Sequence, residues 1–374
     1  MHERGEGAVQ IDMHYYGVYA LVRLAGVRPQ AARTIATASQ YVDDAVDGNI
    51  QYHEEGNKLA PIITAHRIIE VIENRDEDDQ PFVWVPFHFF PGNEGKDFTK
   101  RLVCSKDGRL LNELVSYYLA LHERPFASAL IGLIAHVLAD SFAHFGFSGI
   151  SSRRNKVDAA SIRPINATAP TAKYLDIKLD RFFRQFGFQG GLWTNVRRSI
   201  MSDGAEIASG ALGHGAVAVL PDLPYLEWEF KYEQSSEVSR RNNINIYLEA
   251  CERLHRMFQS FVSISSGHDD GTSGIDFGTV KERVKDILSF QQGKAKRCEK
   301  WRSAFAGGEL GIPAGEEIPY YDSASWDRQR DRFPGLDKPD EIATAEVYHF
   351  YQAASLHRHY VLRELLPGHG LVVI

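Results

Sequence analysis

One stretch of the chain, from Ala129 to Phe147, restricts the fold more than any other part of the sequence. Apolar residues fall on nearly every side of a helix built from it, so this helix is predicted to be buried. The same stretch carries His136, Asp140 and His144 at two successive i,i+4 spacings. Helical geometry places these side chains on one face, one turn above the next. The fold must therefore accommodate three polar side chains inside an apolar core.

A buried carboxylate costs several kcal/mol unless it is paired, hydrogen-bonded or bound to a metal. For a single HxxxD pair, the common explanation is a buried hydrogen-bond ladder that ties helices together. Three members in one row favour metal ligation over that ladder, because His136, Asp140 and His144 can converge on one or two ions. The ladder remains the alternative interpretation.

Helical periodicity dominates the rest of the chain and predicts a mostly α protein, a bundle of helices around a buried metal site. Helices are expected at 15–25, 29–47, 59–74, 109–122, 126–146, 171–186, 240–262, 278–306 and 340–366. The proline-interrupted aromatic segment 81–91 is expected to be extended. Residues 1–262 are expected to form a metal-binding core domain and 263–278 a Gly- and Ser-rich linker or loop. Residues 279–374 are expected to be a helical C-terminal region that packs on the core.

Further histidines and aspartates occur beside apolar residues and extend the row of candidate ligands. All but His14 have an ordinary alternative: Asp12 could cap a helix, Asp43 and Asp44 could be solvated, and His66 or His88 could be core residues. His214 and Asp222 could belong to an ordinary Gly- and Pro-marked turn. The full set of candidate metal ligands is Asp12, His14, Asp43, Asp44, His66, His88, His136, Asp140, His144, His214 and Asp222.

This mixture of imidazoles and carboxylates suits Zn²⁺, Mn²⁺ or Fe, bound as two or three ions. The three cysteines are too far apart in sequence for a thiolate knuckle. Such a cluster activates water for phosphate-ester hydrolysis, with Asp43, Asp44 and Asp140 as candidate catalytic residues. Arg153, Arg154 and Lys156 follow the central helix and are candidates for binding a phosphate group, although a solvated basic turn has the same composition.

The net charge of -7 disfavours nucleic acid as the main partner and favours a small-molecule or lipid phosphate ester. The sequence contains no apolar run of membrane-spanning length. Its first residues are charged and polar where a signal peptide needs an apolar segment, so a cytoplasmic location is expected. Secretion by a route that needs no N-terminal signal is the alternative.

Six sequence blocks in a fixed order resemble a family of uncharacterised bacterial proteins. They are DMHYYG, ATASQYVDDA, TAHRII, PFHFFPG, HVLADSFAHFGFSG and GHGAVAVLPDLPY, and they lie between about residues 9 and 248. The order and type of their polar residues is also remotely similar to the superfamily of zinc-dependent phospholipases C and single-strand nucleases. That superfamily has a mostly α fold around three zinc ions.

The remote resemblance implies a role for each matching position. His136 and Asp140 match an HxxxD helix motif, with Asp140 as the carboxylate that bridges two ions. The other ligands would be His14, one of Asp43 and Asp44, one of His66 and His88, His144, and His214 with Asp222. Asp12 would replace the N-terminal amino group that binds metal in the superfamily, because this chain has no matching Trp.

Two other functions compete with metal-dependent hydrolysis by this cluster. A helical scaffold or binding protein could use the same residues for a structural ion or a polar network, since structural sites are coordinatively closed. An HD-type phosphohydrolase needs an adjacent His-Asp pair on a helix. The one such pair is His268-Asp269, which falls in a Gly- and Ser-rich loop and so disfavours that class.

Overall fold

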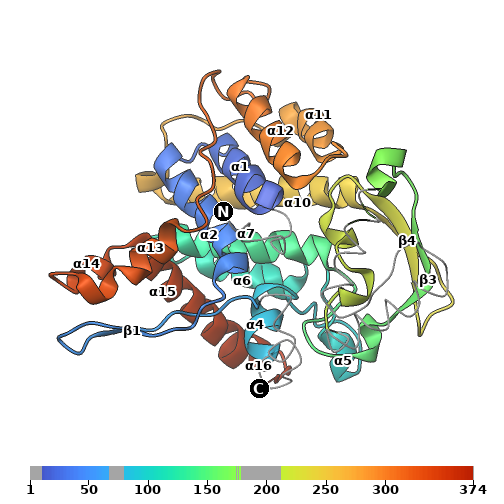
Figure 1. Ribbon diagram of the computed structural model, residues 1–374, viewed down its shortest axis with the longest axis horizontal. Helices are drawn as coiled ribbons and strands as arrows, with labels where there is room; N and C mark the ends of the chain where they lie inside the picture. Colours follow the sequence, from blue (N-terminus) through green and yellow to red (C-terminus); the bar gives the residue numbers. More distant parts are fainter. Residues whose placement is uncertain (1–10, 67–79, 174, 176, 178–211, 374) are drawn as a thin grey trace.

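The computed structural model describes residues 11–66, 80–173, 175, 177 and 212–373. Most of these residues are helical, as the sequence predicts (Figure 1). The N-terminal half contains η1 (Asp12–Gly17), α1 (Val18–Leu24), α2 (Pro29–Asp44), α4 (Gln80–Phe87), α5 (Phe98–Arg101), α6 (Arg109–Leu119), α7 (Ala127–Ala143) and η2 (Arg153–Asn155). The C-terminal half contains η3 (Gly215–Val217), η4 (Leu220–Asp222), α10 (Asn243–Ile264), η5 (Ser266–His268), α11 (Phe277–Leu288), α12 (Lys294–Ala306), α13 (Ser325–Asp331), η6 (Phe333–Gly335), α14 (Asp340–Ala343), α15 (Glu346–His359), η7 (Tyr360–Leu365) and α16 (Leu366–Gly368).

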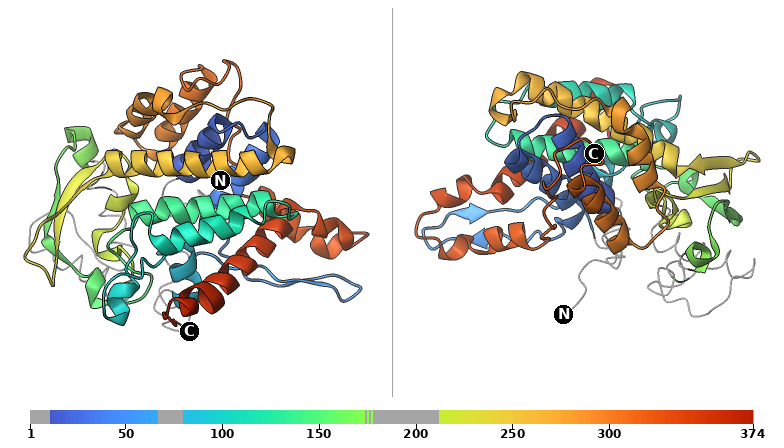
Figure 2. Two further views of the ribbon diagram at one scale, coloured as in Figure 1. Left: turned by 180° about the vertical axis from the view of Figure 1, so that it is seen from behind. Right: turned by 90° about the horizontal axis from the view of Figure 1, so that it is seen from above.

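The helix α7 lies at the centre of the molecule, and α2, α10, α15, α6 and α4 pack around it (Figures 1 and 2). Every residue of α7 except Ser128 is buried, because the helix is apolar on all sides. Helices from both ends of the chain contribute to this one core, including Leu21 of α1 and Phe350 of α15. The regions on either side of the predicted linker at 263–278 therefore share one hydrophobic core.

Five strands accompany the helices in the part of the chain that the structure describes. β1 (Gln51–Tyr52) and β2 (Lys58–Leu59) form an antiparallel hairpin, which projects from one side of the helices in Figure 1. β3 (Val157–Pro164), β4 (Glu227–Tyr232) and β5 (Ser239–Asn242) form an antiparallel sheet in the order β3-β4-β5. The sheet lies at the C-terminal end of α7, where Trp228 and Phe230 pack with Phe147 and Phe89 in a second apolar cluster.

Two sequence-based expectations near α7 are wrong. Residues 59–66 are not helical: Leu59 lies in β2, and Pro61 disfavours helix at the preceding residue. Thr64 instead donates hydrogen bonds to carbonyl groups at the C-terminal end of α2. Its amide donates to Ala45 O (2.9 Å) and its hydroxyl donates to Val42 O (2.6 Å). The rest of that predicted helix lies outside the described residues.

The segment 81–91 was expected to be extended, but it begins with the helix α4. Pro81 lies in the first turn, where a missing amide proton leaves no hydrogen bond unmade, and Pro86 lies one residue from the end. The helix is therefore short, but burial of Val83, Val85 and Phe87 stabilises it.

The other helical predictions agree with the structure apart from their ends and breaks. The expected helix at 278–306 is two helices, α11 and α12, with residues 289–293 between them. The helix expected at 340–366 is divided among α14, α15 and η7. Residues 169–173 are helical, but most of the helix expected at 171–186 lies outside the described residues. None of the described helices has the length and apolar character needed to cross a membrane.

Gly132 allows α2 and α7 to approach closely, and this contact provides a test of the packing. A Cβ atom at this position would lie 2.2 Å from Ile35 O and 2.6 Å from Ala38 Cβ. Gly132→Ala should therefore lower the free energy of unfolding by about 1–3 kcal/mol, measured by urea denaturation, because the backbone of α2 has to move. Gly267→Ala is the matched control, since a Cβ there meets nothing within 4 Å. Equal stability of the two variants would contradict this packing argument.

Candidate metal centre

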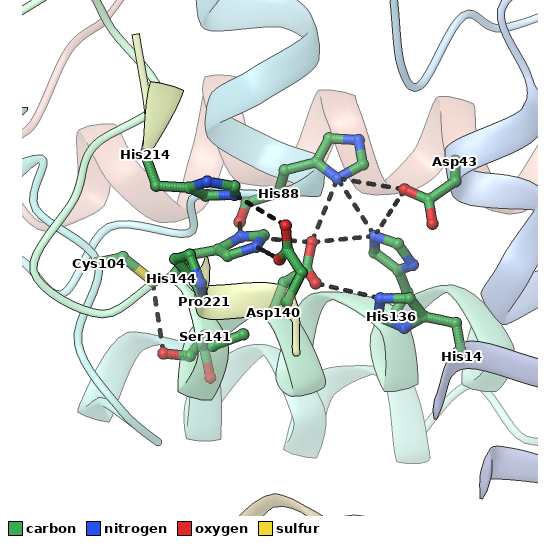
Figure 3. A network of polar contacts seen from close by, with 12 residues as sticks. His14, Asp43, His88, Cys104, His136, Asp140, Ser141, His144, His214 and Pro221 are labelled. Carbon is green, nitrogen blue, oxygen red and sulfur yellow. Dashed lines mark hydrogen bonds and ion pairs between the residues drawn. The ribbon is translucent and has the colours of Figure 1, made fainter. Parts of the chain in front are cut away.

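The row of polar residues predicted on α7 has the expected geometry. His136, Asp140 and His144 lie on successive turns, with His144 immediately after the last helical residue (Figure 3). Asp140 Oδ2 lies 3.1 Å from His136 Nε2 and 3.6 Å from His144 Nδ1. Exposed fractions are 0% for His136, 2% for Asp140 and 6% for His144, so the row is buried.

Three further segments bring side chains to the first half of this row. His14 comes from the π-helical turn η1, its ring stacked on that of His136 at 4.0 Å, and its Nε2 lies 3.2 Å from Asp140 Oδ1. His88 follows α4, and its Nδ1 lies 3.2 Å from Asp140 Oδ2. Asp43, near the end of α2, places Oδ1 3.9 Å from both His88 Nδ1 and His136 Nε2. We call His14, Asp43, His88, His136 and Asp140 the first group.

A second group forms beyond the end of α7. His144 Nε2 lies 3.3 Å from Asp222 Oδ1, and His214 Nε2 lies 3.7 Å from Asp222 Oδ2. Asp222 ends the short helix η4, and His214 precedes η3. We call His144, His214 and Asp222 the second group. Figure 3 shows His14 and Asp43 at one end of the whole arrangement and His214 at the other.

Backbone carbonyl groups fix the orientation of four histidines. The outer ring nitrogens of His136 and His88 contact Ser39 O and Thr64 O, each at 2.9 Å. His144 Nδ1 contacts His88 O at 2.9 Å, and His214 Nδ1 contacts Ala218 O at 2.7 Å. A carbonyl only accepts, so each of these nitrogens donates, and the neutral ring directs the lone pair of its other nitrogen into the site. This is the usual arrangement of histidines that bind metal ions.

The inward-facing atoms require a cation. His88 Nδ1 and His136 Nε2 lie only 3.2 Å apart, and both face Asp140 Oδ2. In the neutral tautomers, two lone pairs and a carboxylate oxygen would face one another without a proton between them. A metal ion or a proton resolves this repulsion. Three sets of these residues could hold a metal ion: His14, Asp43 and His136; His88, His136 and Asp140; and His144, His214 and Asp222.

The buried charges around Asp140 shift one another's pKa values. Burial acts to raise the pKa of Asp140, but the neighbouring His144 and His136 hold it well below its usual range. Burial acts to lower the pKa of His144, but Asp140 and Asp222 raise it to about 9. Burial and the adjacent His14 lower the pKa of His136.

Three other predicted ligands lie outside these groups. Both carboxylate oxygens of Asp12 accept hydrogen bonds from Arg297, at 2.7 and 2.9 Å, and Asp12 does not cap a helix. Asp44 accepts from Tyr321 Oη at 2.5 Å, and burial raises its pKa to about 7. The ring of His66 lies 6.3 Å from that of Trp84. The structure thus brings Asp43 and His88, rather than Asp44 and His66, to the row on α7.

The predicted phosphate-binding residues occupy η2 and the residue after it. Arg154 donates to Asp97 Oδ2 and Thr99 Oγ1, each at 2.9 Å. Its guanidinium group is therefore already engaged on the surface, and Arg153 and Lys156 remain candidates. Sequence reasoning missed Arg297 and the four carbonyl acceptors, because a backbone acceptor has no sequence signal and Arg297 pairs with a residue far away in the chain.

Comparison with known proteins assigns the chain to a family without assigning a reaction. Residues 9–365 match the model of a family of unknown function, DUF6765. The chain belongs to this family. A search of curated proteins gave no significant match, and neither did a search of solved structures. Membership of DUF6765 agrees with the resemblance to uncharacterised proteins, and these comparisons provide no evidence for the link to phospholipase C and nucleases.

Substitution of the two adjacent aspartates of this DUF6765 protein tests which one faces the metal. Asp43→Asn should weaken zinc binding at least about tenfold, since even changes behind the ligands cost that much. Asp44→Asn, the matched neighbour, should leave zinc affinity unchanged, because Asp44 bonds to Tyr321 instead. Competition with a chromophoric chelator measures both affinities. A larger loss in Asp44→Asn would contradict the observed geometry.

The raised pKa of His144 predicts a pH-dependent stability of the metal-free protein. The folded-state pKa of about 9 exceeds the ordinary value of 6.5, so the folded state holds this proton more tightly. The resulting stabilisation is complete below about pH 6.5 and is lost as pH rises through 9. Chelator-treated protein should therefore melt at a lower temperature at pH 9.5 than at pH 6.5. His144→Gln should have a smaller dependence, and identical profiles for both proteins would refute the assignment.

Proposed function

We propose that the protein is a metal-dependent hydrolase of phosphate esters or phosphodiesters that uses two metal ions. The observation that carries the proposal is the combination of buried, oriented imidazoles with one solvent-reaching side chain in each group. The side chains of Asp43 and His214 are 19% and 18% exposed, whereas those of the other six residues are at most 8% exposed. Structural metal sites are coordinatively closed, and a catalytic site keeps a position open.

The number of ions follows from the chemistry of His136. Its Nδ1 donates to Ser39 O, so only Nε2 remains for a metal, and one nitrogen lone pair binds one ion. The two sets of residues that share His136 therefore belong to one site. The proposed centre has two ions, one held by the first group and one by the second. Asp140 lies between His136 of the first group and His144 of the second, and this position supports its proposed role as the connecting carboxylate. Its contact with His144 is to Nδ1, whereas Nε2 faces Asp222 in the second group.

The chemical nature of the ligands favours zinc, with manganese or iron as alternatives. When bound, such ions lower the pKa of a coordinated water and stabilise charge on phosphoryl oxygens. The residues of the chain orient the site: the carbonyl groups fix the imidazoles, and Gln40 Nε2 donates to Asp43 Oδ2 at 3.3 Å. Asp43 is the proposed catalytic carboxylate because its side chain also reaches solvent. The substrate proposed is a small-molecule or lipid phosphate ester, in keeping with the remote resemblance to phospholipases C.

The alternative is a helical scaffold in which the same residues hold a structural ion. The second group offers three side chains to its ion, one fewer than the four ligands of a typical structural zinc site, which leaves a position open and favours the hydrolase. The HD-type alternative has less support, because His268 and Asp269 lie in none of the three potential metal sites and His268 contacts Ser265.

Metal content and hydrolysis together test the proposed function. Protein purified without a chelator or affinity tag should contain two equivalents of metal by elemental mass spectrometry, and His136→Ala should lose one of them. The wild type should hydrolyse bis(p-nitrophenyl) phosphate or p-nitrophenyl phosphate. Asp140→Asn should lose at least about a hundredfold in rate with a modest loss of stability, because metal-ion stabilisation amounts to several kcal/mol. Retained hydrolysis by Asp140→Asn would refute the role of Asp140, and a metal-free wild type after reconstitution would refute the function.

A further inference from the structure

Arg241, the third residue of β5, is a buried cation that contacts backbone and aromatic groups. It is 3% exposed. Its guanidinium group donates to Ala143 O at 3.1 Å, to Phe145 O, and to Tyr232 Oη at 3.5 Å. It also lies 3.9 Å from the centre of the Phe145 ring. A buried charge is costly, so an arginine satisfied in this way indicates a specific structural task.

That task concerns the end of α7, where His144 follows the last helical residue. The last carbonyls of a helix are unsatisfied and carry its negative dipole end. Arg241 binds the peptide group that precedes His144, through Ala143 O, and the peptide group that follows Phe145, through Phe145 O. It therefore holds the backbone on both sides of His144. Tyr232 holds the next peptide, donating to Gly146 O at 3.1 Å. Gly146 has a φ of +87°, which glycine adopts readily, and a Cβ there would lie 2.5 Å from Tyr232 Oη. The chain can therefore turn here in close contact with Tyr232.

Two residues later, Asn243 supports the other side of the second group. It is 2% exposed and begins α10. Its Nδ2 donates to Leu220 O and Leu223 O, each at 2.8 Å, and its Oδ1 accepts from Trp228 Nε1 at 3.1 Å. These carbonyls lie on either side of Asp222. One turn along α10, Tyr247 Oη donates to Pro221 O at 3.2 Å.

We infer that the junction of β5 and α10 positions the second metal group, with Arg241 orienting His144 and Asn243 orienting Asp222. This inference rests on the proposed function, because it assigns a role toward one of the two ions. The first group has its own supports, the carbonyls of Ser39 and Thr64, which come from other segments. Loss of either positioning residue should therefore affect one ion and leave the other bound.

Cobalt and zinc titrations of the full-length protein test the inference. Arg241→Met and Asn243→Leu should bind the first ion as the wild type does and the second about 10- to 100-fold more weakly, the usual effect of losing a group behind a ligand. The residual cobalt absorption spectrum of both variants should match that of His144→Ala and differ from that of His136→Ala. Arg241→Lys, which keeps the charge, should recover part of the affinity.

Arg240→Met is the matched control. Arg240 is the neighbouring residue, but its side chain is 62% exposed and pairs with Glu227, so this variant should bind both ions normally. Wild-type affinity for the second ion in Arg241→Met and Asn243→Leu would overturn the inference, as would equal weakening of both ions. If Arg241→Met does not fold, Arg241→Lys and Asn243→Leu still decide the outcome. A wild type that binds no metal would overturn the proposed function and this inference together, whereas two ions bound with wild-type affinity in every variant would overturn the inference alone.

Discussion

The burial of Asp140 is the constraint on which the centre of this structure depends. The carboxylate lies inside an apolar helix, and histidines from three segments surround it: His14, His88, and His136 with His144. Without them, burial would force the carboxylate to take up a proton. With them, it stays ionised, and the histidines in turn need a cation between their facing nitrogens. The apolar helix α7 can thus bury Asp140 because distant segments supply polar partners for it.

The packing of α2 on α7 also determines how the ring of His136 is oriented in the site. Gly132 and His136 lie one turn apart on α7, and Ile35 and Ser39 lie one turn apart on α2. The close approach of Gly132 to Ile35 O places Ser39 O within 2.9 Å of His136 Nδ1. A larger residue at 132 would separate the helices at the turn next to this hydrogen bond. The small residue therefore contributes to the site through the distance between two helices.

The sequence was sufficient for the mostly helical fold and for the row on α7, because both depend on local periodicity. It could not choose between Asp43 and Asp44, since this depends on how α2 ends, and Thr64 settles that end by binding its last carbonyls. The choice between His66 and His88 depended on a helix expected at 59–74 that is absent over 59–66. Asp12 pairs with Arg297, which lies 285 residues away, so no local pattern indicates this contact. Local patterns identify candidate ligands, and long-range contacts select among them.

The two groups differ in how the fold supports them. The first group combines residues of η1 and α2, and the residue that follows α4, with residues of α7, so its geometry is set by helix packing in the main core. The second group joins the end of α7 to the loop around Asp222, beside the β3-β4-β5 sheet and its separate apolar cluster. Metal affinity includes the free energy needed to order the ligands. Because different parts of the core order the ligands, the two proposed sites need not have equal affinity.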